Sequence, residues 1–228
     1  MNILALEWSA ERGGVALCTA GKPIAQQSVS AAVAHAGQLL TAVEEARRLT
    51  GWDWDQIDCY AVGCGPGRYS GLRTAVTVAR HLALPGKTPI RAVSSGDALA
   101  AELAATHPDA AHLAIIGDAR RERIWWRHYD NQAGRAVAQG SWTLTTQKEW
   151  LATIPAKTWV GSPDWERLHS LRIAAQSDTN LRWIEHPCMP NAEWVARLAW
   201  MEEIAGTAPR PCSPIYLHPP VAAKDAVQ

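Results

Sequence analysis

The chain has 228 residues and a hydrophobic fraction of 47%, which suits one large domain or two small lobes with a sizeable core. Its 22 basic and 22 acidic residues cancel, so a whole-protein field that attracts nucleic acid is excluded, although a local basic patch remains possible. No stretch approaches the roughly 20 apolar residues of a membrane span, and the first residues have no basic region typical of a signal peptide, so we expect a cytoplasmic protein.

The first half of the chain predicts three strands followed by alternating helices and strands. Residues 2–8 include the unbroken apolar run Ile3 to Leu6, and turns separate this buried strand from two more strands, expected over 14–20 and 23–29. Apolar residues at helical spacing predict a helix over 34–50 that ends at Gly51. The other expected elements are a strand over 57–63, a helix over 70–84, a strand over 90–93 and a helix over 95–105.

The second half repeats this opening. Residues 113–118 form an apolar strand that ends in an acid, as residues 3–7 do, and a strand over 122–129 follows with a third beyond the turn at 131–134. The repeat indicates an α/β protein with a duplicated β-meander plus helices, and this order is similar to the two-lobed actin-like and ribonuclease-H-like folds. Two unrelated hairpins are the alternative.

The boundary between the lobes is expected where His107-Pro108-Asp109 breaks the last helix of the first half. We therefore expect an N-terminal lobe over 1–108, a C-terminal lobe over 109–218, and a flexible tail over 219–228.

The stretch from Gly63 to Arg73 lies between a strand and a helix and is rich in glycine. Glycines permit positive φ and let another backbone or a ligand come close, and the N–H groups of a following helix can hold an anion. The stretch has neither the Gly-Lys-Ser/Thr of a P-loop nor the G-x-G-x-x-G spacing. A phosphate cradle and a structural turn therefore both remain open. The structural reading assigns the loop to Gly63, Gly65, Pro66, Gly67 and Gly71.

Glu7 and Asp118 stand at the ends of corresponding strands. Paired carboxylates there can hold Mg²⁺ with a nucleotide phosphate. The alternative is that each carboxylate caps a turn or meets a neighbouring arginine, and the bulky Trp8 beside Glu7 favours it.

A metal site has little support in the sequence. The eight histidines include no H-x-x-x-H or H-E-x-x-H pair, and His35 is alone in its helix. The five cysteines are an odd number without a C-x-x-C pair, so we expect reduced thiols and no zinc.

Arginines and aromatic residues alternate along the strand expected over 122–129. Arg120, Arg121, Arg123 and Arg127 surround two tryptophans, Trp125 and Trp126, as on some nucleic-acid-binding surfaces. Neighbouring residues on a strand point to opposite faces, so the two indoles cannot share one. A solvated hairpin with one buried Trp is favoured, and a minor tRNA contact is the alternative.

The two helices that flank the glycine-rich stretch are apolar on more than one side. The helix over 34–50 has two apolar rows, and the helix over 70–84 carries Val78 and small residues opposite its main apolar face. Such helices need a second burial partner, either another subunit or this chain's own loops.

The string Gly63-Cys64-Gly65-Pro66-Gly67-Arg68-Tyr69-Ser70-Gly71-Leu72-Arg73 resembles the G-x-G-P-G-S-F-T-G-x-R signature of the TsaB (YeaZ) family, in the glycoprotease-like superfamily. Four other stretches agree with family motifs, and together they span residues 1 to about 218. They are Met1 to Ser9, Ala34-His35-Ala36, Asp118-Ala119-Arg120 followed by Glu122, and Pro214-Ile215-Tyr216-Leu217.

This resemblance implies a non-catalytic scaffold subunit with an actin-like fold, no cofactor and no metal. TsaB-like proteins pair with the catalytic subunit TsaD through the first two helices, and the ATPase TsaE joins them. The complex transfers a threonylcarbamoyl group to N6 of adenosine 37 in tRNA, which is bound mainly through the complex. Members alone often form homodimers through the same helices. For this chain the implied partner interface is His35, Leu39, Ala42, Val43, Ala46, Arg73, Thr74, Thr77, Val78 and His81.

Three departures from the family pattern argue against a nucleotide or anion at their positions. Glu7-Trp8 replaces Asp-Thr, Arg68 replaces Ser, and His218 replaces the closing Arg. Two other functions remain open. A stand-alone actin-fold ATPase or small-molecule kinase would bind Mg-ATP and depend on Glu7, and a metallopeptidase would hold zinc.

Overall fold

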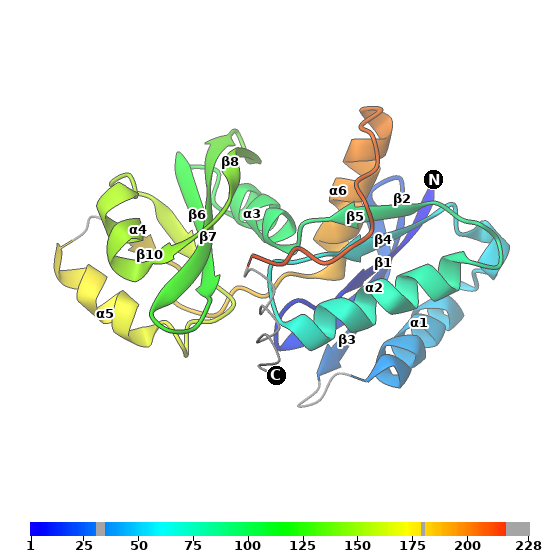
Figure 1. The fold of residues 1–228 in the computed structure, drawn as a ribbon. Coiled ribbons are helices and arrows are strands. Elements are labelled where there is room, and N and C mark those ends of the chain that lie inside the picture. Colours follow the sequence, from blue (N-terminus) through cyan, green and yellow to red (C-terminus); the bar gives the residue numbers. More distant parts are fainter. Residues whose placement is uncertain (31–34, 179–180, 218–228) are drawn as a thin grey trace, which may run out of the picture.

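Two five-stranded sheets form the framework of the computed structural model, which describes residues 1–30, 35–178 and 181–217 (Figure 1). The first sheet contains β1 (Asn2–Glu7), β2 (Arg12–Thr19), β3 (Lys22–Ser30), β4 (Cys59–Gly63) and β5 (Ile90–Val93). The second contains β6 (His112–Asp118), β7 (Arg123–Gln132), β8 (Arg135–Thr146), β9 (Trp159–Gly161) and β10 (Arg182–Trp183). The helices are α1 (Ala36–Thr50), α2 (Tyr69–Ala83), α3 (Ser95–Thr106), α4 (Gln147–Thr153), α5 (His169–Asp178) and α6 (Ala192–Ile204), with a short 3₁₀ turn η1 (Trp54–Gln56).

The two sheets have the same strand order and the same directions. The first runs β3-β2-β1-β4-β5, and the second, taken from its β8 edge, runs β8-β7-β6-β9-β10. In each sheet the three meander strands pair antiparallel, and the last two join in parallel. The duplicated meander predicted from the sequence is confirmed, and the reading of two unrelated hairpins is excluded.

Strand β1 lies in the middle of the first sheet with both faces covered. Because side chains alternate along a strand, Ile3 and Ala5 pack with α6, whereas Leu4 and Leu6 pack with α1 and α2 on the opposite face. Burial on both faces explains why the run is continuously apolar and shows no alternation of polar residues.

The last helix of each half packs on the sheet of the other half. Helix α3 follows β5, yet its Leu99 and Leu103 lie in a cluster with Leu113 and Tyr129 of the second sheet. Helix α6 follows β10, yet it packs on β1 and β2 (Figure 1). By packing, α3 therefore belongs to the second lobe and α6 to the first. The lobe boundaries over 1–108 and 109–218 remain a prediction, because a helix break shows where a helix ends and not which sheet covers it.

The helices of the first half begin and end close to the predicted positions. Gly51 at the end of α1 has φ 69° and donates its N–H to the Arg47 carbonyl, the C-terminal cap expected for a glycine. Residue 34 and the tail predicted over 219–228 lie outside the described residues.

Candidate functional site

The glycine-rich loop between β4 and α2 is held by hydrogen bonds to its own lobe and to the start of α3. Cys64 N–H donates to the Val93 carbonyl at 2.8 Å, and Gly65 N–H donates to Ser95 Oγ at 2.9 Å. Arg68 N–H, just before α2, donates to the Ser9 carbonyl at 2.7 Å. These three amide donors are therefore already used inside the chain.

Three positions of this loop must be glycine because the loop lies very close to the turn between β1 and β2. A Cβ at Gly63 would lie 1.7 Å from Glu7 Oε2, and one at Gly67 would lie 2.2 Å from the Ser9 carbonyl oxygen. A Cβ at Gly71, in the first turn of α2, would lie 2.0 Å from the Trp8 carbonyl oxygen. Contacts this short exclude a side chain. These three glycines are therefore explained by the packing of the loop against the turn of the chain.

Two other loop residues contribute backbone geometry. Gly65 has φ 96°, which favours glycine, and Pro66 is buried after a cis peptide bond. Trp8 is only 2% exposed and packs in the core of the first lobe. The indole therefore fills the interior and lines no open cleft.

Glu7 is fully buried and acts as a turn residue. Its Oε1 accepts a hydrogen bond from the Ser9 N–H at 2.5 Å, while Oε2 lies beside Gly63 without a hydrogen-bond partner among the described residues. Desolvation raises the pKa of the Glu7 carboxyl above its ordinary 4.5. Burial thus disfavours the ionised form of Glu7, which is the form that binds a cation.

Asp118 also serves its own turn. Its Oδ1 accepts from the Arg120 N–H at 2.9 Å, and its Oδ2 lies 3.6 Å from Arg120 Nε. The interpretation of Glu7 and Asp118 as turn residues is confirmed, with a neighbouring arginine only at Asp118. Across the described parts of the chain, no group of three or more His, Cys, Asp or Glu side chains is arranged to hold a metal ion.

Helices α1 and α2 pack side by side on one face of the first sheet (Figure 1). Half of the side chains expected at a partner interface are buried in this core. They are Leu39, Ala42, Val43, Ala46 and Val78. A partner contact of these five residues remains a prediction. The apolar rows of α1 and α2 serve the chain's own sheet, which a helical pattern alone cannot distinguish from a subunit interface.

The other expected interface residues are on the surface of the two helices. His35, Arg73, Thr77 and His81 are exposed, and Thr74 is half-buried. Arg73 extends along the helix and donates to the Tyr69 hydroxyl at 2.6 Å.

The expected interface left out four large apolar residues that lie exposed on or beside α1 and α2. Leu40 and Leu49 are exposed on α1, Tyr69 is exposed at the start of α2, and Leu84, directly after α2, is 73% exposed. Their signal in the sequence was a large apolar residue at a position where the helix otherwise carries polar ones. Leu40, Tyr69 and Leu84, together with His35, Arg73, Thr77 and His81, make up what we call the helix-pair face. Leu49, nine residues after Leu40, lies on the other side of α1.

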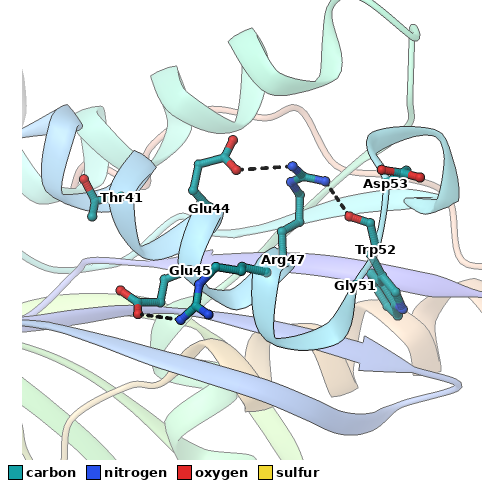
Figure 2. Close-up of a pocket in the computed structure, with 8 residues that line it drawn as sticks. Thr41, Glu44, Glu45, Arg47, Gly51, Trp52 and Asp53 are labelled. Carbon is teal, nitrogen blue, oxygen red and sulfur yellow. Dashed lines mark hydrogen bonds and ion pairs between the residues drawn. The ribbon is translucent and has the colours of Figure 1, made fainter.

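A shallow hollow of about 540 Å³ lies at the C-terminal end of α1 (Figure 2). Its charged lining is paired internally, with Arg47 against Glu44 at 3.2 Å and Arg48 against Glu45 at 3.3 Å. None of the predicted site residues lines it.

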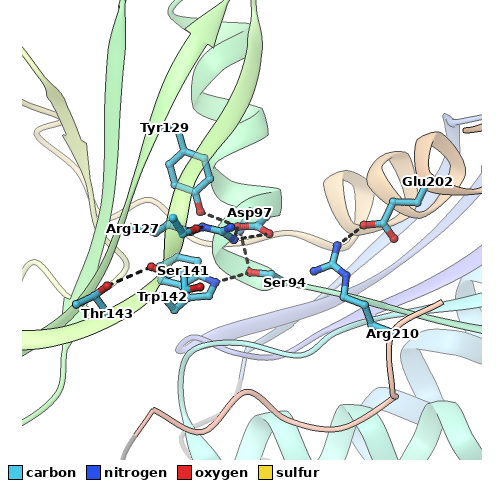
Figure 3. A network of polar contacts seen from close by, with 10 residues as sticks. Ser94, Asp97, Arg127, Tyr129, Ser141, Trp142, Thr143, Glu202 and Arg210 are labelled. Carbon is cyan, nitrogen blue, oxygen red and sulfur yellow. Dashed lines mark hydrogen bonds and ion pairs between the residues drawn. The ribbon is translucent and has the colours of Figure 1, made fainter. Parts of the chain in front are cut away.

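A polar network fixes the start of α3 against β7 and β8 (Figure 3). Asp97 accepts hydrogen bonds from Arg127 Nη1 at 3.0 Å and from the Tyr129 hydroxyl at 2.7 Å. Trp142 Nε1 donates to Ser94 Oγ at 3.2 Å. Arg127 is therefore a structural residue and is not free to bind nucleic acid.

The two tryptophans of β7 point to opposite faces, as predicted. Trp125 is buried with the cluster that contains α3, whereas Trp126 is half-buried against the cluster that contains Trp150. Arg120, Arg121 and Arg123 are exposed, and the possible tRNA contact remains a prediction for these three residues.

Two lobes with duplicated sheets and exchanged helices define an actin-like α/β protein. An activator of 2-hydroxyisocaproyl-CoA dehydratase from Clostridium difficile superposes with a TM-score of 0.50 at 11% identity, covering 90% of this chain and 97% of that one. A likeness at this level shows the fold alone.

The family follows from closer matches. The model of the family described as TsaD, tRNA N6-adenosine threonylcarbamoyltransferase, matches residues 28–151, more than half of the chain. The chain belongs to this family, and within it to the TsaB (YeaZ) branch.

Two relatives illustrate the match. The tRNA threonylcarbamoyladenosine biosynthesis protein TsaB of Haemophilus influenzae is 29% identical over 126 residues, which are 55% of this chain and 52% of that protein. YeaZ from Pseudomonas aeruginosa superposes with a TM-score of 0.78 at 25% identity, covering 95% of this chain and 99% of that one. The chain thus spans about half the length of the TsaB sequences it matches. Within the described residues, no helix is both long and apolar enough to cross a bilayer.

Proposed function

We propose that this protein is a TsaB-type accessory subunit in the synthesis of threonylcarbamoyladenosine on tRNA. In this role it binds and activates a TsaD-like catalytic subunit, which transfers the threonylcarbamoyl group to N6 of adenosine 37. The observation that carries the proposal is the similarity to TsaB proteins, together with the match to YeaZ over 95% of the chain.

The packing of the glycine loop supports an accessory role rather than a catalytic one. The loop amides donate to Val93, Ser95 and Ser9, and Trp8 fills the core beside them. Glu7, the carboxylate that a phosphotransferase of this fold would need, is buried, and this burial disfavours its ionised form. The loop is therefore suited to hold α2 at a fixed angle to the sheet.

The helix-pair face is the proposed contact with the catalytic subunit. Large apolar side chains such as Leu40, Leu84 and Tyr69 expose surface that loses contact with water when a partner covers it. Arg73 and His81 add polar groups at the same helices. The same face would join two copies of this chain when the catalytic subunit is absent. A TsaE-like ATPase and tRNA complete the proposed cytoplasmic complex, with tRNA bound mainly through the complex.

Co-purification with the cognate TsaD-like subunit tests this interface. We expect Leu40→Glu and Leu84→Glu each to weaken capture of a tagged partner at least tenfold, because a carboxylate would be buried at the contact. Ile204→Glu is the matched control. Ile204 is 65% exposed at the end of α6, which covers the opposite face of the first sheet, so this change should leave capture unaltered.

Modified tRNA provides the second measurement. Depletion of the protein should lower the threonylcarbamoyladenosine content of digested tRNA, and the wild type and Ile204→Glu should restore it. Unchanged modification after depletion would contradict the proposed function. If Leu40→Glu and Leu84→Glu both restore tRNA modification and both capture the partner as the wild type does, only the proposed face is contradicted.

A further inference from the structure

The segment after α6 returns across the first lobe and lies against α2 and the glycine loop (Figure 1). Ile215 N–H donates to the Cys64 carbonyl at 2.7 Å, and Arg80 of α2 donates to the Cys212 carbonyl. The ring of Tyr216 lies 5.4 Å from that of Tyr69. Contacts on both sides of Cys212 therefore fix this residue beside the loop.

The thiols of Cys64 and Cys212 meet at this contact. Cys64 is buried in the core cluster of the first lobe, and half-buried Cys212 packs against the same cluster from outside. The two thiols are close enough for each to shift the pKa of the other, that of Cys64 upward and that of Cys212 downward. The other three cysteines belong to different clusters, Cys18 and Cys59 on the opposite face of the first sheet and Cys188 in the second lobe.

The surroundings make Cys212 the most acidic thiol among the five. The hydrogen bond from Cys64, supported by the Arg80 guanidinium, lowers the pKa of Cys212 to about 7. Burial raises the pKa of Cys18 to about 12 and those of Cys59 and Cys188 to about 11. Because the thiolate is the reactive form, Cys212 is suited to react first and Cys64 to react second.

We propose that Cys64 and Cys212 form a redox modification site, which a peroxide converts to an intramolecular disulfide that ties the C-terminal segment to the glycine loop. The Cys212 thiolate attacks one oxygen of hydrogen peroxide, so that an S–O bond forms, the O–O bond breaks and hydroxide leaves as water after protonation. The Cys64 sulfur then attacks the sulfenic sulfur of Cys212. The S–S bond forms, the S–O bond breaks, and the Cys64 proton leaves with the hydroxide as a second water. The two thiols lose two electrons, and the peroxide gains them.

The disulfide would hold the segment against α2 whatever the function of the protein. In the reduced state this contact depends on hydrogen bonds and on the tyrosine pair. In the oxidised state the segment cannot leave α2 without reduction, so we expect slower amide hydrogen exchange over 205–217. The inference is therefore independent of the proposed role in tRNA modification.

Thiol counting on the full chain tests the proposal. The reduced protein is treated with a small excess of hydrogen peroxide, unfolded, alkylated with N-ethylmaleimide and weighed by mass spectrometry. We expect five adducts before oxidation and three after it, because the bridge consumes two of the five thiols, and dithiothreitol should restore five. Tandem mass spectrometry of the tryptic peptides should join Cys64, and not Cys59 of the same peptide, to Cys212.

Cys212→Ser should retain four alkylated thiols with and without peroxide, with folding verified by circular dichroism. Cys64→Ala should instead fall from four to three without a bridge and gain oxygen at Cys212, because no second thiol is there to displace the hydroxide. Cys188→Ala is the matched control and should fall from four adducts to two. Five adducts in the oxidised wild type, a bridge to any other cysteine, a dimer linked between chains, or sulfinic acid at Cys212 without a bridge would each overturn the proposal. Since the wild-type measurement needs no variant, a variant that fails to fold does not weaken the test.

Discussion

Replacement of Gly71 by alanine probes whether the glycine loop holds α2 against the β1–β2 turn. The added Cβ would lie 2.0 Å from the Trp8 carbonyl oxygen, about 1.4 Å closer than the 3.4 Å at which ordinary contact begins. The oxygen belongs to the backbone and the Cβ is fixed to it, and both lie in packed regions, so the turn or the helix must move. Overpacking of this kind costs about 1–3 kcal/mol, and the value should lie at the upper end because no flexible side chain can yield.

Alanine also favours the helix over glycine by about 1 kcal/mol, which offsets part of this cost. We therefore expect Gly71→Ala to lower the free energy of unfolding by about 2 kcal/mol, a fall of roughly 4–8 °C in the midpoint for a chain of this size. Gly37→Ala is the matched control, since Gly37 also lies in the first turn of a helix, but a Cβ there would meet no atom of the described residues within 4 Å. That variant should be more stable than the wild type by about 0.5 kcal/mol.

Urea unfolding followed by circular dichroism measures both variants under the same conditions. The two substitutions change the same atoms in the same kind of element, so the difference between them isolates the contact with Trp8. If Gly71→Ala is as stable as Gly37→Ala, the loop does not clamp α2, and the structural reading of its glycines is refuted. If the clamp exists, Gly71→Ala should also weaken capture of the TsaD-like subunit, whereas Gly37→Ala should weaken it less.

Two further predictions concern buried charge. Because burial raises the pKa of Glu7, its neutral form stabilises the fold below the ordinary value of 4.5, and this contribution is lost as pH rises through the folded-state pKa. Glu7→Gln, an isostere of the neutral form, should therefore gain stability relative to the wild type in urea unfolding as the pH rises above the ordinary value of 4.5 toward the folded-state pKa; a constant difference would show that Glu7 does not titrate in this way. Arg127→Ala should lower the free energy of unfolding by about 1–3 kcal/mol, because it leaves half-buried Asp97 without its cation. Replacement of the exposed Arg123 by alanine is the control and should change this free energy by less than about 0.5 kcal/mol. Equal effects of the two changes would contradict a structural role for Arg127.

Local patterns in the sequence were sufficient for the elements of the first half and for the duplication. Gly51 marked the end of α1, and the matching strands 3–7 and 113–118 indicated two sheets of one design. The opposite directions of Trp125 and Trp126 also followed, because the period of a strand is fixed by the backbone. These features depend on residues close in sequence. By contrast, no element was predicted between residue 147 and the end of α6, where the strands β9 and β10 are only two or three residues long.

The candidate site depended more strongly on contacts between distant residues. The sequence alone showed that the stretch from Gly63 to Gly71 is rich in glycine and that it carries the family motif. Only the tertiary structure decided why, since the atoms that exclude a side chain belong to Glu7, Trp8 and Ser9, more than fifty positions earlier in the chain. The same holds for α1 and α2, whose apolar rows the sequence shows but whose burial against this chain's own sheet it does not. An amphipathic pattern shows that one face of a helix is covered. Packing between distant parts of the fold decides which surface covers it.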